Sequence, residues 1–358
     1  MPAPEPTQAA EAPRDILVIK PSSLGDVVHT LPSVALLRRA FPEARIRWLI
    51  NTEWMPLLTG NPYIDEVIEF PRRNFRGVRG ALRIAPWARQ LRQRVTADLI
   101  LDYQGLLRSA LIARLCREDK SRVIGLSDAR EGARFLYDHA VDVSGVAHAV
   151  DRYLALTRHV TGASGASAAP TSIPPAAGKI VSDPSTGPCL RDYPPPWSWP
   201  WGDAPRGFQS EDRFIVLHPF SRGSGKSLTV EQVREFCRAL PGEKIVIAGR
   251  VDVPLPPMEG AVDLLNKTSL LELVWLLRFA KFVVSVDSGP MHIAAAVTER
   301  LVSIHTWSDP AKVGPYQPDA WVWKDGALFQ MKDLADPAKR QPAAGIADIA
   351  RHVASCLQ

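Results

Sequence analysis

Short apolar runs recur along both halves of the sequence, and segments with helical spacing separate them. The first 126 residues hold ILVI, IRWLI, EVIEF, DLILD and RVIGL. After residue 213 come FIVLHP, EKIVIAG, VDLL, FVVSVD and LVSIHT, with TVEQVREFCRAL, SLLELVWLLRFA and MHIAAAV between them. The runs are continuous rather than alternating, which indicates strands of a parallel sheet covered on both faces. The sequence therefore predicts an α/β chain with two Rossmann-like series.

The composition changes between the two series. The segment 161–212 contains TGASGASAAPTSIPPAAGK and YPPPWSWPWGDAP, which is typical of a linker. Trp197, Trp199 and Trp201 are too apolar for a tether in water, so we expect them to pack against a domain or cover a cleft. The predicted organisation is a disordered N-terminal tail, a first domain, this linker, a second domain and a C-terminal helix, at 1–14, 15–160, 161–212, 213–340 and 341–358.

Composition bounds the class of protein. No apolar run approaches the ~18–20 residues needed to span a bilayer, and the start, MPAPEPTQAAEAPR, has no apolar core of a secretory signal. The cysteines, Cys116, Cys189, Cys237 and Cys356, form no C-x-x-C pair, which argues against a zinc site or a disulfide framework. We expect a soluble cytoplasmic protein.

One segment is strongly basic. Between Phe70 and Ala97 there are eight arginines and no acidic residue, at positions 72, 73, 76, 79, 83, 89, 92 and 94. A helix face that is merely solvated tends to mix both signs of charge. The segment is compatible with such a face, but its lack of acids favours an anionic partner, which could be a phosphorylated substrate, a membrane surface or nucleic acid.

No G-x-G-x-x-G phosphate loop occurs, but FIVLHPFSRGSGKS is close to a P-loop. The P-loop pattern needs a glycine where this chain has Phe220. A P-loop-like ATP-dependent kinase thus stays an alternative, while the simpler reading is that backbone amides and Lys226 face an anion near a helix start.

Carboxylates follow two of the predicted strands. Asp26 lies in the turn after ILVI, beside Gly25, and Asp287 ends FVVSVD, just before Ser288 and Gly289. The carboxyl ends of parallel strands are where α/β proteins bind ligands. Asp26 could accept a proton from a substrate hydroxyl or could cap the following helix, and His29, one turn along, is a competing base.

Taken together and in this order, the motifs resemble those of glycosyltransferase family 9, the ADP-heptose lipopolysaccharide heptosyltransferases, and the heptosyltransferase I type in particular. The similar segments run from about residue 15 to residue 316. They are KPSSLGDVVHTLP, DYQGLLRSA, SDAREGARFLY, HAVDRY, the GSGK loop, SLLELVWLLRFAKFVVSVDSGPMHIAAA and SDPAKVGPY.

This resemblance implies a GT-B fold, in which the parallel sheets of two Rossmann-like domains face a central cleft and the last helix crosses back toward the first domain. It implies an inverting, metal-independent transfer of heptose from ADP-heptose to a Kdo-lipid A-type acceptor, with no cofactor and no nucleic-acid partner. The enzyme would be cytoplasmic and peripheral at the inner membrane. A family member that binds the nucleotide sugar without turnover stays a further alternative. The sequence also has no D-x-D, the usual metal motif of enzymes that use sugar nucleotides.

The resemblance also carries over site residues. The catalytic pair is Asp26 as the proton acceptor and Lys226 at the leaving diphosphate, and no metal ligand is expected. The donor-binding residues are Ser221, Lys226, Asp287, Ser288, Gly289 and His292. The acceptor-binding residues are Ser23, Gly25, Arg72, Arg73, Arg76, Gln104, Arg108, Arg130 and Glu131.

Overall fold

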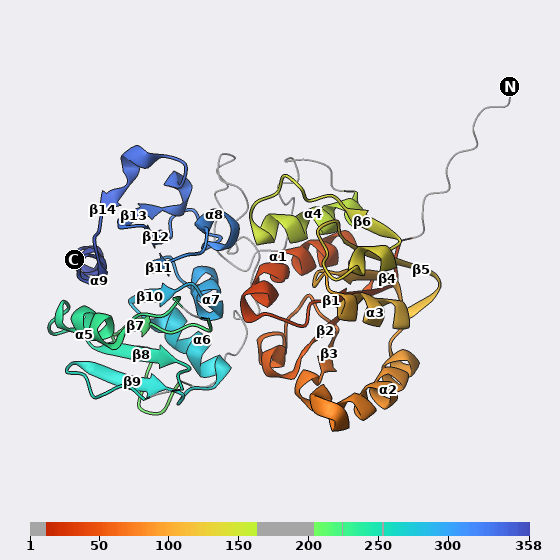
Figure 1. Cartoon of the computed structure of the whole chain (residues 1–358), viewed down its shortest axis with the longest axis horizontal. Coiled ribbons are helices and arrows are strands. Elements are labelled where there is room, and N and C mark those ends of the chain that lie inside the picture. Colours follow the sequence, from red (N-terminus) through yellow and green to blue (C-terminus); the bar gives the residue numbers. More distant parts are fainter. Residues whose placement is uncertain (1–11, 163–203, 224, 253) are drawn as a thin grey trace.

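The computed structural model describes residues 12–162, 204–223, 225–252 and 254–358. Most of the predicted N-terminal tail and linker, with Trp197, Trp199 and Trp201, lies outside these residues. The described residues form two α/β domains that lie side by side (Figure 1). None of their helices combines the length and apolar character needed to cross a membrane.

The first domain is built on a six-stranded sheet of order β3-β2-β1-β4-β5-β6, in which all neighbouring strands are parallel. The strands are β1 (Asp15–Ile19), β2 (Arg45–Asn51), β3 (Glu66–Phe70), β4 (Ala97–Asp102), β5 (Arg117–Leu126) and β6 (His139–Val141). The helices are α1 (Leu24–Ala40), α2 (Gly77–Arg94), α3 (Leu107–Leu115) and α4 (Ala149–Thr161), with the short 3-10 helices η1 (Thr52–Leu57), η2 (Arg72–Phe75) and η3 (Ala133–Leu136).

The second domain has an eight-stranded sheet of order β14-β13-β12-β11-β10-β7-β8-β9. Its strands are β7 (Ile215–His218), β8 (Ile245–Gly249), β9 (Ala261–Leu265), β10 (Phe282–Val286), β11 (Leu301–His305), β12 (Trp321–Lys324), β13 (Ala327–Gln330) and β14 (Gln341–Pro342). Only the β12–β13 and β13–β14 pairs are antiparallel among these. The helices are α5 (Val230–Arg238), α6 (Leu270–Phe279), α7 (Gly289–Val297), α8 (Pro310–Val313) and α9 (Ile346–Leu357), with the 3-10 helices η6 (Met331–Asp333) and η7 (Pro337–Lys339).

Each sheet has one point where the strand order changes direction. In the first sheet it lies between β1 and β4, and in the second between β7 and β10. At such a point the two strand ends lead into connections that run to opposite faces of the sheet, which leaves a crevice for a ligand. Most of the predicted site residues follow these four strands. Arg72, Arg73 and Arg76 follow β3 instead, and Arg130 and Glu131 follow β5.

The domains touch where α1 meets α7. A Cβ added to Gly25 would lie 2.5 Å from Cδ2 of His292, and one added to Gly289 would lie 2.6 Å from Cδ2 of Leu24. Both glycines thus allow the opposite domain to approach closely. One apolar core continues through this contact, from Val18 and Val28 of the first domain to Ile293 of the second.

The predicted arrangement of two Rossmann-like domains is confirmed, and every apolar run named above lies in a strand. The small hairpin of β12–β14 was missed. The prediction that the last helix crosses back toward the first domain is wrong. The buried residues of α9, Ile346, Ile349, Ala350 and Val353, all join the core of the second domain, where α9 packs against α5. Their spacing places them on one helix face, and α5 supplies the surface that this face covers.

Candidate active site

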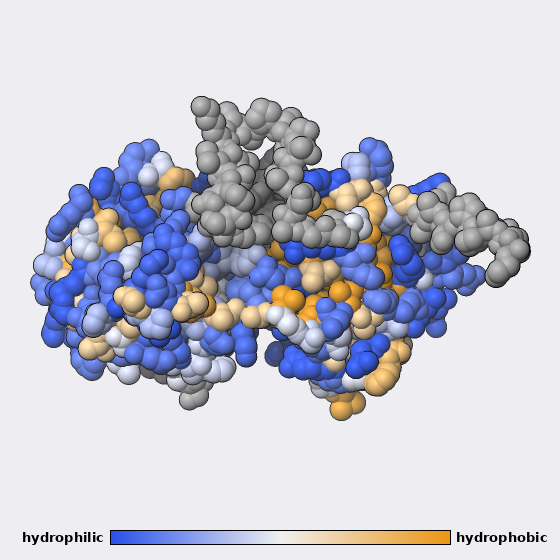
Figure 2. Space-filling model, turned by 90° about the horizontal axis from the view of Figure 1, so that it is seen from above, coloured by the Kyte–Doolittle hydropathy of each residue, from blue (hydrophilic) through white to orange (hydrophobic). Residues whose placement is uncertain are grey.

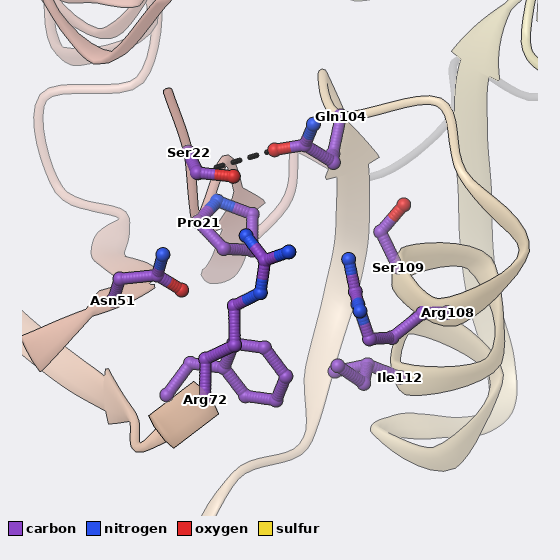
Figure 3. A pocket seen from close by; sticks show the side chains of 9 residues that line it. Pro21, Ser22, Asn51, Arg72, Gln104, Arg108, Ser109 and Ile112 are labelled. Atoms are coloured by element: carbon purple, nitrogen blue, oxygen red, sulfur yellow. Dashed lines mark hydrogen bonds between the residues drawn. The ribbon is translucent and has the colours of Figure 1, made fainter. Parts of the chain in front are cut away.

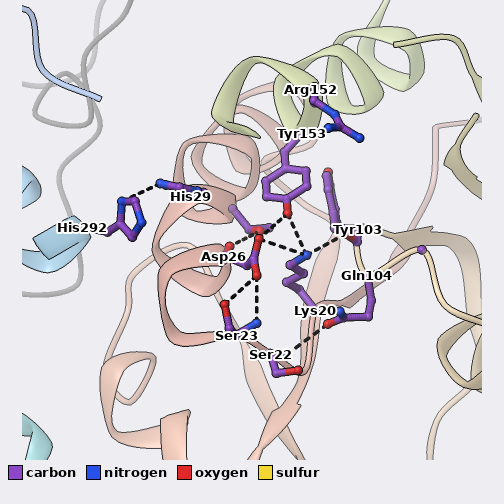
Figure 4. Close-up of polar contacts among 12 residues, drawn as sticks. Lys20, Ser22, Ser23, Asp26, His29, Tyr103, Gln104, Arg152, Tyr153 and His292 are labelled. Carbon is purple, nitrogen blue, oxygen red and sulfur yellow. Dashed lines mark hydrogen bonds and ion pairs between the residues drawn. The ribbon is translucent and has the colours of Figure 1, made fainter. Parts of the chain in front are cut away.

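Asp26 lies at the switch point of the first sheet, in the first turn of α1. The Ser23 N–H donates to Asp26 Oδ2 at 3.0 Å, and the Ser23 hydroxyl donates to the same oxygen at 2.7 Å (Figure 4). Ser23 is the N-cap of α1 and Asp26 is the third residue of the helix. Asp26 therefore does not cap the helix itself, but its carboxylate holds the capping residue in place.

A buried lysine and a tyrosine hold the other carboxylate oxygen. The Tyr153 hydroxyl, on α4, donates to Asp26 Oδ1 at 2.8 Å. Lys20 Nζ donates to Tyr153 Oη at 2.7 Å and to the Tyr103 carbonyl at 2.9 Å, and lies 3.7 Å from Asp26 Oδ1. The lysine, the phenol and the carboxylate thus form one polar cluster at the end of β1 (Figure 4).

This cluster controls the charge of Asp26. Burial opposes ionisation, but the Lys20 ammonium and the hydrogen bonds from Ser23 outweigh it and hold the pKa of Asp26 well below its ordinary value. Burial lowers the pKa of Lys20, while Asp26 and Asp102 oppose that shift because they favour the ammonium. The carboxylate is therefore ionised and fixed in direction at neutral pH.

A pocket opens beside this cluster at the carboxyl ends of four neighbouring strands (Figure 3). Three predicted acceptor residues line it, and the Ser22 N–H donates to Gln104 Oε1 at 3.1 Å across the switch point. Arg72 and Arg108 both line the pocket, and their guanidinium groups give it a positive lining suited to an anionic group. Its lining residues are Pro21, Ser22, Asn51, Phe70, Arg72, Gln104, Arg108, Ser109 and Ile112.

The buried carboxylate of Asp102 organises one wall of this pocket. It accepts from the N–H groups of Gln104 and Gly105, at 2.9 and 3.2 Å, and from the Ser109 hydroxyl at 2.8 Å. Burial raises the pKa of Asp102, against the effect of these donors. The turn that carries Gln104 and the start of α3, which carries Arg108, are thereby fixed together.

The remaining predicted acceptor residues lie outside the lining. Arg73 and Arg76 are exposed around η2. Arg130 is exposed, and its N–H donates to the Gly105 carbonyl at 2.8 Å. Glu131 has a left-handed backbone (φ 57°), and its Oε2 accepts from the Leu107 N–H at 3.2 Å, at the start of α3. Arg130 and Glu131 thus support the turn behind the pocket.

The second switch point brings Lys226 and Asp287 together. Lys226 Nζ donates to Asp287 Oδ2 at 2.8 Å, and it lies 4.7 Å from the ring centre of Trp307, which is exposed. Burial opposes ionisation of Asp287, but the hydrogen bonds from Lys226 and Ser308 outweigh it and lower its pKa. Ser288 is the N-cap of α7, and its hydroxyl lies 3.3 Å from His218 Nδ1.

The loop of Ser221 and Lys226 is not a P-loop. The Ser221 N–H donates to the Ser227 hydroxyl at 3.0 Å, so the loop closes on itself. Helix α5 begins only at Val230, with Thr229 as its N-cap, so Lys226 and Ser227 do not lie at the start of the helix. A P-loop places this lysine and hydroxyl at the helix N-terminus. The geometry disfavours the kinase alternative.

His292 faces the other domain. His29 Nε2 lies 2.9 Å from His292 Nδ1, and the His29 and His148 rings are 5.5 Å apart. All three are buried, and burial lowers the pKa of each, so they are neutral at pH 7. None of the hydrogen bonds among the described residues joins His29 to Asp26. His29 therefore serves the domain contact, and the geometry favours Asp26 as the base.

Sequence reasoning missed several residues of the site. Lys20, Tyr103 and Tyr153 surround Asp26, and Asn51 and Phe70 complete the pocket. One signal was present, because a lysine directly after the buried ILVI strand needs a carboxylate partner.

Known proteins have sequences similar to that of this chain. The profile of glycosyltransferase family 9 (heptosyltransferase) matches residues 84–175 and 237–342. The lipopolysaccharide heptosyltransferase 1 of Salmonella typhimurium is 27% identical over 322 residues, which cover 84% of this chain and 91% of that protein. The Pseudomonas aeruginosa protein of the same name is 29% identical over 314 residues, which cover 84% and 81%.

Solved structures share the fold. The Escherichia coli heptosyltransferase WaaC with ADP superposes with a TM-score of 0.68 at 21% identity and covers 96% of this chain and 98% of its own. The Escherichia coli ADP-heptose lipopolysaccharide heptosyltransferase II gives 0.63 at 21% identity and covers 96% and 100%. The likeness confirms the predicted GT-B fold.

Proposed function

This chain belongs to glycosyltransferase family 9, the heptosyltransferases, and we propose that it transfers a heptose from ADP-heptose to a Kdo-lipid A-type lipopolysaccharide acceptor. The relatives named above are lipopolysaccharide heptosyltransferases, and one solved neighbour holds ADP. These matches support the donor and the class of acceptor. The roles proposed for individual residues rest on the geometry of the site.

The observation that carries this assignment is the opposite burial of two lysine–aspartate pairs. At the first switch point Lys20 is 3% exposed and Asp26 is 34% exposed. At the second, Lys226 is 21% exposed and Asp287 is 9% exposed. The first pair therefore offers a carboxylate to a substrate, and the second offers an ammonium. An ionised carboxylate can accept a proton, and an ammonium can bind a diphosphate.

The proposed reaction is a single displacement. The acceptor hydroxyl oxygen attacks the anomeric carbon of the heptose and its proton passes to Asp26, while the bond from that carbon to the β-phosphate oxygen breaks. The nucleophile comes from the side of the first domain and the leaving ADP stays on the second. Attack opposite to the leaving group inverts the anomeric configuration.

Lys226 stabilises the negative charge that develops on the leaving diphosphate. It lies beside the start of α7, whose first N–H groups carry the positive end of the helix dipole. Preorganised donors of this kind supply transition-state stabilisation without a metal ion. We therefore propose a metal-independent transfer, with Asp287 holding the lysine in position.

The acceptor binds in the pocket lined by Arg72, Gln104 and Arg108. Guanidinium groups pair well with the carboxylates of Kdo and with phosphates. Because such an acceptor is a lipid, we also propose that the enzyme works at the cytoplasmic face of the inner membrane.

Incubation of the enzyme with ADP-heptose and Kdo-lipid A tests the proposal. We expect a product heavier by one heptosyl unit, of inverted configuration, with undiminished yield in EDTA. Binding of ADP-heptose without product would favour the non-catalytic alternative. Phosphate transfer from magnesium-ATP would favour the kinase and contradict the proposal.

A further inference from the structure

Helix α2 (Gly77–Arg94) is attached to the protein along only part of its surface. Among its residues whose side chains are described, only Gly80 and Leu91 are buried. The Trp87 ring packs against Phe70 and Phe75, with ring centres 5.2 and 5.3 Å apart, which fixes the second half of the helix. A helix in water normally needs an apolar stripe buried along its length. The first half of α2 has no such cover among the described residues.

Large apolar side chains on this half face solvent. Val78 is 85% exposed and Leu82 is 75% exposed, and Ile84 is 45% exposed. With 3.6 residues per turn, Val78 and Leu82 share one stripe with Arg89, on the side of the helix opposite to Leu91. Single exposed apolar side chains are ordinary, but Val78 and Leu82 lie on the same outer line of the helix and together form an apolar ridge.

Arginines border this ridge. Arg79 and Arg83 lie on one side of it and Arg92 on the other, by the same helical spacing. Arg94 pairs with Glu66 at 2.6 Å, but the ion pairs among the described residues include none from Arg79, Arg83, Arg89 or Arg92. In its first half the outer face of α2 is thus apolar along Val78 and Leu82 and cationic at its borders, and Arg89 continues the same stripe in the second half.

We propose that α2 is a membrane-docking helix, with Val78 and Leu82 inserted among the headgroups of an anionic leaflet and the arginines in contact with lipid phosphates. Helices with these features lie in the interface between water and bilayer. Nucleic acid fits less well, because it pairs with the arginines but gives the aliphatic ridge nothing to contact. A second copy of this chain fits less well, because the unpaired arginines of two copies would repel each other.

The position of α2 connects membrane docking to the proposed function, and this part of the inference rests on that proposed function. Arg72, in the short helix directly before α2, lines the pocket assigned to the acceptor. Figure 1 places α2 at the outer edge of the first domain, away from the second. With α2 on the leaflet, a lipid-anchored sugar could enter the pocket while its acyl chains stay in the membrane.

Co-sedimentation with vesicles tests the docking, with neither donor nor acceptor present. The full chain is mixed with phosphatidylcholine vesicles that contain or lack phosphatidylglycerol. We expect binding only with phosphatidylglycerol, weakened by salt. Val78→Ser with Leu82→Ser should lower the partition coefficient about tenfold, and Arg79→Gln with Arg83→Gln by on the order of tenfold or more. The charge-matched control is Arg206→Gln with Arg238→Gln, both exposed and outside the first domain, which should bind as the wild type does.

Several outcomes would overturn the docking. Unchanged binding in Val78→Ser with Leu82→Ser would mean that nothing inserts, and an equal loss in the control would mean that only net charge matters. Duplex RNA binding that depends on Arg79 and Arg83, with the vesicle binding insensitive to them, would point to nucleic acid instead.

Transfer assays separate this inference from the proposed function. With a deacylated, water-soluble acceptor we expect the α2 variants to turn over as the wild type does. A loss there would assign α2 to the acceptor site rather than to the membrane. Absence of transfer by the wild type itself would contradict the proposed function but leave the vesicle result standing.

Discussion

The two switch points of this protein carry the same two residue types in opposite arrangements. In the first domain, Lys20 and Asp26 come from one strand–helix connection, and Tyr153 of α4 closes over them. In the second, Lys226 and Asp287 follow different strands and are 61 residues apart in the sequence. The lysine is buried in the first pair and the aspartate is buried in the second.

This difference shows how burial decides which residue of a lysine–aspartate pair is available to a ligand. The more buried partner finds its hydrogen bonds inside the protein, and the more exposed one keeps its charge available to a ligand.

The domains also differ at their surfaces. Among the described residues, most of the exposed large apolar side chains belong to the first domain. They are Val78, Leu82, Ile84, Leu107, Leu111 and Phe135, against Val230 and Trp307 in the second domain. In the view of Figure 2 the deepest hydrophobic colour likewise lies on the first domain.

The largest expected effect comes from removing the charge that the first pair offers. Asp26→Asn keeps an oxygen that can accept from the Ser23 N–H but cannot take up the proton. We expect turnover to fall by a factor on the order of 10²–10⁴. We also expect a lower melting temperature, because the buried Lys20 ammonium loses its charged partner. Steady-state transfer and a melting curve check this, with His29→Ala as the companion variant. Retained activity in Asp26→Asn with loss in His29→Ala would move the base to His29.

The next effect concerns the charge that the second pair offers. Lys226→Ala removes a contact to the leaving diphosphate worth roughly 2–4 kcal/mol, so kcat/KM should fall by about 30- to 1000-fold. The control is Lys267→Ala, whose surface pair with Asp263 should contribute ~1 kcal/mol or less and leave transfer unchanged. Equal activity of the two variants would remove Lys226 from the mechanism.

A smaller effect should be confined to the acceptor. Arg72→Glu with Arg76→Glu reverses charge at the pocket and at the segment beside it, so we expect the KM for the acceptor to rise about tenfold at low salt and less at high salt. The Kd for ADP, measured by calorimetry, should stay the same because these residues belong to the first domain. A matching loss of ADP binding would contradict the division of labour between the domains.

The last effect is on stability rather than on activity, and it depends on pH. Burial lowers the pKa of His218 and His305, both in the second domain, to about 4. The unfolded chain binds these protons near pH 6.5, so the stabilisation from the neutral rings is complete above that pH. It declines by up to ~1.4 kcal/mol per pH unit for each ring as the pH falls toward 4. Urea unfolding at pH 7 and 5 should show this decline in the free energy of unfolding. His305→Asn should reduce the decline by the contribution of one ring. An unchanged slope would show that the folded chain protonates these rings near their ordinary pKa.

Sequence patterns predicted most of the fold because the buried strands are continuous apolar runs. They also predicted Asp26, Lys226 and Asp287, because each lies next to such a run. The hairpin of β12–β14 was missed because its strands are short and lie at the sheet edge, where the pattern is weak. The position of α9 was wrong because its apolar face does not specify which domain it covers.

Which residue of each lysine–aspartate pair is buried could not be predicted in the same way. The burial of Lys20 depends on Tyr153, which is 133 residues away in the sequence, and on the carbonyl of Tyr103. Likewise, the contact of His29 with His292 needs both domains in place, since 263 residues separate the two rings. Such long-range contacts leave no mark in the local spacing of residues.

The most direct test of the opposite roles is a calorimetric titration of ADP into two variants, Asp26→Asn and Lys226→Ala, beside the wild type. ADP carries the diphosphate but no sugar to transfer, so its affinity reports the anion site alone. We predict that Asp26→Asn binds ADP with the wild-type Kd and that Lys226→Ala binds it at least tenfold more weakly. Equal weakening in both variants, or weakening only in Asp26→Asn, would contradict the claim that the first pair offers a base and the second an anion-binding lysine.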